Sequence, residues 1–171
     1  MTASNSRSEK GGFRLAACEV FGLGRMPFAP GSWGSLPPVA LAFALTLVNT
    51  DHRVIDMSVG LLGIAFGIIC LVWGDHAERC VGKKDPGRVV ADEVAGQAIT
   101  LMWLPWSTNW ANNFAICSIA FVAFRFFDVI KPPPARRLQK IHGGAGILVD
   151  DLIAGLYALG LTHIIVRSAS L

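Results

Sequence analysis

The chain has 171 residues, a length that suits one domain, and 53% of them are hydrophobic whereas only 16% are charged. Because soluble domains carry about 25% charged residues, this composition predicts that much of the surface faces lipid. The formal net charge of +3 is small and no basic stripe is interleaved with aromatic residues, so nucleic acid is not an expected partner. The four cysteines lack a metal-ligand spacing and are interpreted as buried apolar side chains.

In chain order, a polar and mildly basic tail over residues 1–20 precedes a helical domain over residues 21–167. Apolar runs without strand-type alternation predict an all-α single-domain bundle of about five short, membrane-embedded helices. The runs are Leu36–Asn49, Met57–Trp73, Val94–Trp106, Ala111–Phe124 and Leu152–Val166. Most are shorter than the ~20 residues that cross a bilayer core. A soluble helical bundle is therefore the alternative, and the run Val94–Trp106 could cross or re-enter.

The basic residues are distributed unevenly between the loops. If all five runs cross and the N-terminus lies inside, the inside segments 1–33, 74–92 and 125–148 hold 13 of the 15 Lys and Arg residues. This asymmetry is the one expected for a multi-pass membrane protein, in which cytoplasmic loops are positive. It also places every polar motif of the chain at the cytoplasmic ends of the helices.

Carboxylates recur at these ends. Asp92–Glu93 and Asp150–Asp151 lie at the mouths of two predicted helices, and Asp128 lies at the end of a third. Several acids sharing one pocket would repel each other, and a hard divalent cation such as Mg²⁺ relieves that repulsion. The alternative is that each acid caps a helix N-terminus. Two pairs and a fifth acid on one side favour a metal site built from all five.

Basic residues adjoin the acids. Lys131 follows Asp128 by three positions, and Arg136 follows the run Pro132–Pro134, which ends the helix. A guanidinium suits phosphate through paired hydrogen bonds, and a lysine serves as a point charge. These residues could instead serve only the charge asymmetry between the loops.

Two glycine-rich turns complete the pattern. In "PFAPGSWGS" the candidates are Gly31, Ser32 and Ser35, whose turn could hold a phosphate at a helix N-terminus or form a tight interfacial turn. His142 before two glycines could act as a general acid or as a helix cap. The usual covalent phosphatase motifs are missing from the sequence, so an enzyme acting on phosphate here would depend on metal-assisted attack of water.

The blocks "PFAPGSWGS", "DPGRVVADEVAG", "FRFFDVIKPPPARR" and "HGGAGILVDDLIAG" resemble, in order and spacing, the signature blocks of the phosphatidylglycerophosphatase A family. The resemblance covers about Gly22 to Tyr157. It implies an all-helical enzyme of the bacterial inner membrane that uses Mg²⁺ to remove the terminal phosphate of phosphatidylglycerophosphate, giving phosphatidylglycerol. The positions to which it points are Asp85, Asp92, Glu93, Arg125, Asp128, Lys131, Arg136, His142, Asp150 and Asp151.

The expected mechanism places the lipid head group at the cytoplasmic face. The acids hold Mg²⁺, Lys131, Arg136 and Arg125 bind the phosphate, Asp85 supports them, and His142 protonates the departing glycerol oxygen. Two alternatives from the residues are a small transporter or channel subunit and a lipid phosphatase of broader preference. Asp75 and Glu78 are expected to be solvated outside the site. The number of metal ions and the oligomeric state are left open.

Overall fold

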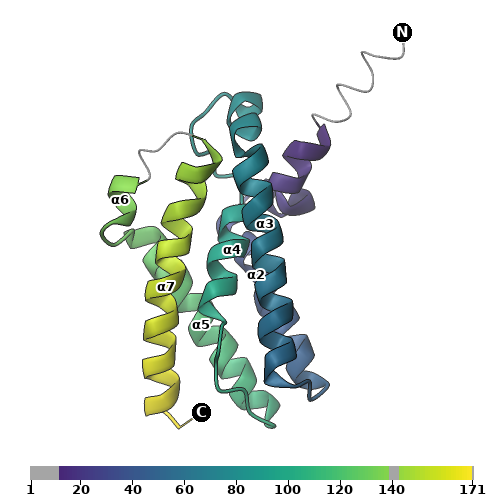
Figure 1. Cartoon of the computed structure of the whole chain (residues 1–171), viewed down its shortest axis with the longest axis vertical. Coiled ribbons are helices and arrows are strands. Elements are labelled where there is room, and N and C mark those ends of the chain that lie inside the picture. The colour runs from purple at the N-terminus through teal and green to yellow at the C-terminus, as the bar shows by residue number, and fades with distance from the viewer. Residues whose placement is uncertain (1–11, 139–142, 171) are drawn as a thin grey trace.

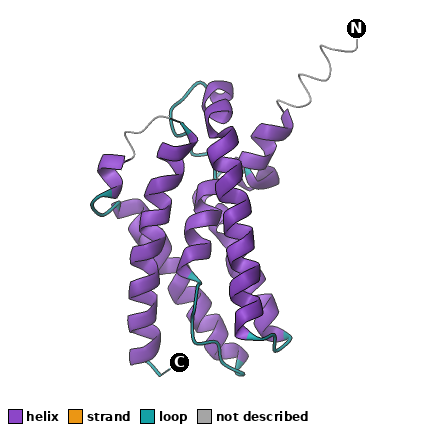
Figure 2. Cartoon of the chain, viewed as in Figure 1, coloured by secondary structure: helices purple, strands orange, loops and turns teal. Residues whose placement is uncertain are grey.

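The computed structural model describes residues 12–138 and 143–170, and within them the chain is helical throughout apart from its connections (Figures 1 and 2). Residues 12–18 are helical and lead into the 3-10 helix η1 (Val20–Arg25). The remaining helices are α2 (Pro30–Leu47), α3 (His52–Val81), α4 (Ala91–Thr100), α5 (Trp110–Ile130), α6 (Ala135–Leu138) and α7 (Gly144–Ser168). No strand occurs in the described ranges, and the expected all-α fold is confirmed.

Helix α4 lies at the centre of the bundle. It packs against α2, α3, α5 and α7, and eight of its ten residues are buried. In Figure 1 the N-terminal ends of α2, α4 and α7 and the C-terminal ends of α3 and α5 lie toward one end of the bundle. The loops that carry the polar motifs are therefore gathered at that end, called here the polar end.

Three helices, α3, α5 and α7, are long and apolar enough to cross a membrane. The structure thus offers three candidate spanning helices, whereas the sequence suggested five shorter apolar runs. Helix α4 has ten residues, which at ~1.5 Å per residue reach about 15 Å, half of a hydrocarbon core of ~30 Å. The run Val94–Trp106 is not one continuous helix, because the helix ends at Thr100 and residues 101–109 form turns and irregular chain.

Two of these helices are longer than their apolar runs predicted. Helix α3 has 30 residues and α7 has 25, because each continues past its lipid-compatible stretch into the polar end. Part of the tail predicted over residues 1–20 is helical and packs against the bundle. Residues 12–18 are helical and Ala17, Cys18 and Glu19 are buried, so this part belongs to the domain. Residues 1–11 lie outside the described residues.

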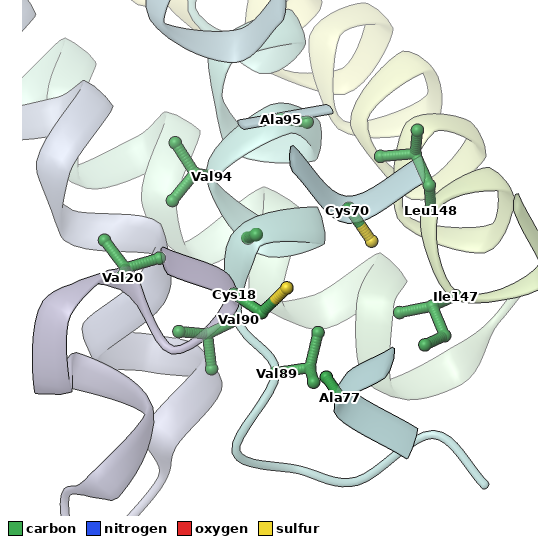
Figure 3. Packing of buried hydrophobic residues seen from close by; sticks show 11 residues of the cluster. Cys18, Val20, Cys70, Ala77, Val89, Val90, Val94, Ala95, Ile147 and Leu148 are labelled. Atoms are coloured by element: carbon green, nitrogen blue, oxygen red, sulfur yellow. The ribbon is translucent and has the colours of Figure 1, made fainter. Parts of the chain in front are cut away.

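An apolar cluster holds the polar end together (Figure 3). Cys18 from the N-terminal helix, Cys70 from α3, Val90 before α4 and Ile147 from α7 all belong to it. Cys70 donates through Sγ to the carbonyl oxygen of Gly144 at 3.7 Å, joining α3 to the start of α7. Three of the four free cysteines are buried, as expected, and Cys80 is exposed.

Candidate active site

Three carboxylates meet inside the polar end. Asp92 and Glu93 lie in the first turn of α4 and Asp151 lies in the second turn of α7, and each offers an oxygen within 4.8 Å of the others. Asp92 is 6% exposed and Asp151 is 3% exposed. One buried oxygen of each side chain (Oδ1 of Asp92, Oε2 of Glu93, Oδ2 of Asp151) accepts no hydrogen bond from the described residues. We call these three residues the acid cluster.

The two acids of α4 have perturbed pKa values. Burial raises the pKa of Asp92 well above its ordinary value, and the negative charge of Glu93 raises it further. Burial also raises the pKa of Glu93, to about 8, and the charge of Asp151 adds to the effect. Charged forms of these acids need a counter-charge that the cluster itself lacks. A donor set made only of carboxylate oxygens, with unpartnered lone pairs, fits a hard divalent cation such as Mg²⁺.

Glycines let α4 and α7 approach closely enough to form the cluster. A Cβ atom on Gly155 would lie 2.4 Å from the carbonyl oxygen of Gly96, and one on Gly96 would lie 2.6 Å from the carbonyl oxygen of Asp151. Thr100 bridges the two helices, because its Oγ1 lies 3.2 Å from the carbonyl oxygen of Gly96 and 3.3 Å from that of Gly155. The backbone contact therefore fixes the height of Asp151 beside the first turn of α4.

Two cations at the edge of the cluster are held by the remaining acids. Lys131, at the C-terminal end of α5, donates through Nζ to Oδ2 of Asp150. Nη1 of Arg125 lies 2.7 Å from Oδ2 of Asp128, one turn further along α5. Adjacent helix positions point about 100° apart, which is why Asp151 enters the cluster while Asp150 turns to α5. The five predicted metal ligands are thus divided into a cluster of three and two acids in ion pairs.

The predicted phosphate turn is the first turn of α2. A Cβ atom on Gly31 would lie 2.5 Å from Oε1 of Glu93 and 2.8 Å from Nη1 of Arg125, so the turn touches the cluster directly. Ser35 is buried, and its Oγ donates to the carbonyl oxygen of Gly31 at 2.8 Å. Ser32 lies between them and is half-buried. Their phosphate-binding role stays a prediction.

Of three other predicted site residues, the structure describes one fully, one by its backbone alone and one not at all. Asp85 lies in the α3–α4 loop with a φ of 46°, and its charge acts on Asp92. Arg136 lies in α6, but its side chain is outside the described part of the structure. His142 lies outside the described residues altogether, so its role as a general acid stays a prediction.

Two acids that were expected to be solvated hold the loops of the site in place. Asp75 accepts through Oδ1 from the backbone N–H of Gly144 at 2.9 Å and so caps α7. Glu78 accepts through Oε1 from the backbone N–H of Asp85 at 2.9 Å. Gly143 has a φ of 81°, and a Cβ there would lie 1.8 Å from Oδ1 of Asp75. The partners of Asp75 lie 68 and 69 residues away, so no local sequence pattern could have revealed this cap.

A groove beside the acid cluster has the character of a lipid site. It encloses about 370 Å³ between α3, α4 and α7, and apolar residues line it. Its lining includes Ala95, two residues after Glu93, and Leu152, next to Asp151. Ile64 and Ile68 of α3 also line it and are more than half exposed. The groove thus opens to the lipid-compatible surface of α3 and is lined by residues of the two helices that carry the acid cluster.

Together these features define a class: a helical protein of membrane-spanning composition with a buried acid cluster at one end. The sequence profile of the family described as phosphatidylglycerophosphatase A matches residues 16–166. The chain therefore belongs to the phosphatidylglycerophosphatase A family, which confirms the predicted resemblance, and its enzyme class is that of the phosphoric monoester hydrolases.

Curated relatives agree over most of the chain. A phosphatidylglycerophosphatase A of Escherichia coli is 34% identical over 147 residues, covering 85% of this chain and 78% of the relative. The Haemophilus influenzae protein of the same name is 34% identical over 148 residues, covering 81% and 80%. A Bacteroides thetaiotaomicron protein provisionally named phosphatidylinositol-3-phosphatase is 33% identical over 138 residues, covering 81% and 84%. No solved structure matches the chain at a significant level.

Proposed function

We propose that the protein removes the terminal phosphate of phosphatidylglycerophosphate, giving phosphatidylglycerol, at the cytoplasmic face of a bacterial inner membrane. The observation that carries this proposal is the acid cluster, because buried carboxylates with unpartnered oxygens serve a cation-dependent reaction better than they serve stability. The relatives named phosphatidylglycerophosphatase A, both 34% identical, support this lipid as the substrate.

We further propose that Asp92, Glu93 and Asp151 hold Mg²⁺. When bound, the ion would supply Lewis-acid polarisation of the phosphate and lower the pKa of the attacking water. The chain's own contribution is to gather three oxygens within 4.8 Å before the substrate arrives. Their burial also keeps bulk water away, which strengthens electrostatic interactions inside the site.

The two cations at the edge of the cluster would neutralise charge on the transferring phosphoryl group. Electrostatic stabilisation of this kind dominates phosphoryl transfer. Asp128 holds the Arg125 guanidinium next to Gly31, and Asp150 holds Lys131 at the mouth of α7. In this proposal Arg136 also binds phosphate, the Gly31–Ser35 turn borders it, and His142 protonates the leaving glycerol oxygen. Asp85 supports the loop above them.

The bundle would present a lipid substrate to this site from the side. In this proposal the polar end lies at one membrane surface, which the three candidate spanning helices support, and the positive charge of its loops favours the cytoplasmic surface. An acyl chain in the groove between α3, α4 and α7 would bring its head group toward the acid cluster. The head group could thus reach the site while the acyl chains stay in the bilayer.

A second candidate is a phosphatase of broader lipid preference. The Bacteroides thetaiotaomicron relative is 33% identical and is named for a different lipid monoester. The acid cluster is compatible with any phosphomonoester that a lipid presents at the interface. A transporter or channel subunit is not favoured, because the cluster lies at one end and the family consists of enzymes.

A substrate panel separates these candidates. Purified protein would be assayed with phosphatidylglycerophosphate, phosphatidylinositol 3-phosphate, phosphatidic acid and a soluble phosphate ester, each with Mg²⁺ and with EDTA. The proposal predicts that phosphatidylglycerophosphate gives the highest kcat/KM and that EDTA abolishes turnover. Equal rates on the three lipids would favour the broader enzyme, and turnover that persists in EDTA would contradict the metal site.

A further inference from the structure

A second polar pocket is lined by residues of the α3–α4 loop and by none of the acid cluster. It has a volume of about 470 Å³ and lies between the end of η1, the start of α2 and the loop that leads to α4. Arg25, Lys83 and Arg88 contribute its charged lining, and no acidic side chain lines it among the described residues. We call it the basic pocket.

A buried acid fixes two of the three cations. Glu19 is fully buried beneath them, with its Oε2 2.6 Å from Nε of Arg25 and its Oε1 2.8 Å from Nη2 of Arg88. Each ion pair engages one nitrogen, whereas a guanidinium carries five N–H donors in a fixed fork. The side chains of Arg25 and Arg88 are 56% and 47% exposed. Glu19 therefore orients both forks while leaving much of each accessible to an anion.

The basic pocket adjoins the acid cluster through two connections. Pro30 lines the pocket, and the next residue, Gly31, approaches Glu93 as described above. Arg88 precedes Asp92 by four residues, so their α-carbons are at most about 14 Å apart. One head group with two phosphates can bridge such a gap with the help of a long arginine side chain.

The surroundings place the basic pocket at a membrane surface. Phe28 before α2 is 82% exposed and directly follows Pro27, which lines the pocket, and Phe21 in η1 is 69% exposed three residues before Gly24, which also lines it. Exposed apolar rings next to basic side chains are typical of surfaces that contact the boundary between head groups and acyl chains. A lipid phosphate at a membrane surface is therefore within reach of this pocket.

We propose that Arg25, Lys83 and Arg88 bind the phosphodiester of the lipid substrate while its phosphomonoester lies at the acid cluster. This inference rests on the proposed function and extends it, because it explains how the enzyme would prefer a lipid with two phosphates to one with a single phosphate. Glu19 is a positioning residue in this scheme, since it acts only through the two arginines.

Kinetics on two lipids test the inference. Lys83→Gln is the cleanest variant, because Lys83 is exposed and outside the ion pairs with Glu19. It should raise KM for phosphatidylglycerophosphate about 5-fold, the size of one exposed ion pair, with kcat unchanged and KM for phosphatidic acid unaffected. Arg88→Gln should act in the same direction, and Arg88→Lys should restore part of the affinity. Arg79→Gln removes an equal charge outside the pocket and serves as the control.

A binding measurement separates this inference from the proposed function. Short-chain phosphatidylglycerol carries a phosphodiester and no monoester, and its affinity can be measured by calorimetry in EDTA without turnover. Lys83→Gln and Arg88→Gln should weaken it about 5-fold, whereas Arg79→Gln should not. If affinity depends on these residues but no lipid is hydrolysed, the inference stands and the proposed function fails.

Two results would overturn the inference. The first is unchanged phosphatidylglycerol affinity and unchanged KM in both pocket variants. The second is an equal rise of KM on phosphatidylglycerophosphate and phosphatidic acid that disappears in micelles without anionic host lipid. That result would mean that the pocket senses the charge of the membrane surface rather than the substrate.

Discussion

Gly96 of α4 and Gly155 of α7 lie in backbone contact, so close that a Cβ on Gly155 would stand 2.4 Å from the carbonyl oxygen of Gly96. This contact sets the distance between the helix that carries Asp92 and Glu93 and the helix that carries Asp151. The geometry of the acid cluster therefore depends on two residues that carry no functional group.

Gly155→Ala should loosen this contact. The added methyl group must push α7 away from α4, and overpacking of this kind costs about 1–3 kcal/mol. We expect a lower midpoint of thermal unfolding in detergent and a loss of phosphatase activity. The control is Gly160→Ala in the same helix, where nothing lies within 4 Å. If both variants are equally stable and active, the contact does not set the site.

Asp92→Asn and Asp151→Asn should each lower kcat/KM at least about 100-fold. Substituting a residue that only hydrogen-bonds to a metal ligand already lowers metal affinity or activity up to about 100-fold, and these two residues are proposed as ligands themselves. Both variants should remain folded, because replacing one buried acid with an amide removes mutual repulsion. The matched control is Asp56→Asn, because Asp56 accepts from the backbone N–H of Trp103 at 3.0 Å and an asparagine oxygen can still accept. Near-normal activity in both cluster variants would rule out the proposed metal site.

The pair of Lys131 and Asp150 should show strong coupling in a double-mutant cycle. Asp150 is 3% exposed and Lys131 is 25% exposed, so Lys131→Met leaves a buried charge unpaired and should cost about 2 kcal/mol of stability. Adding Asp150→Asn to Lys131→Met should recover most of the stability but none of the activity, because the cation would still be missing. Additive stability effects would show that the ion pair is not formed.

Metal-free protein should lose stability as the pH rises. Glu93 has a pKa of about 8 in the folded protein against 4.5 for an unperturbed glutamate. The folded state therefore keeps a proton that the unfolded state releases, so this contribution is complete below 4.5 and is lost as the pH rises through about 8. Thermal unfolding in EDTA should occur at a lower temperature at about pH 9 than at about pH 6. A flat or rising profile would contradict the burial of the Glu93 carboxyl.

Much of the acid cluster could be predicted from the sequence, but the end of α4 could not. Asp92, Glu93 and Asp151 adjoin apolar runs at ends that the positive-inside pattern assigns to one side, and the structure brings them together. The end of α4 was missed because Leu101, Met102 and Trp103 continue the apolar pattern after the helix has stopped. Apolar composition at these positions indicates burial, but it does not indicate whether the backbone is still helical.

Long-range pairing could not be predicted in the same way. Whether Asp150 or Asp151 enters the cluster depends on the rotation of α7, which its contact with α4 fixes. The cap that Asp75 places on Gly144 joins residues 69 positions apart. The roles of His142 and Arg136 stay predictions, because the first residue and the side chain of the second lie outside the described part of the structure.

The most direct test of the account is phosphate release from phosphatidylglycerophosphate by purified wild-type protein and by Asp151→Asn, titrated with Mg²⁺ after chelation. The account predicts no release without metal, saturable recovery for the wild type, and a weaker or absent recovery for Asp151→Asn. Release by the chelated wild type, or identical Mg²⁺ curves for the two proteins, would contradict it.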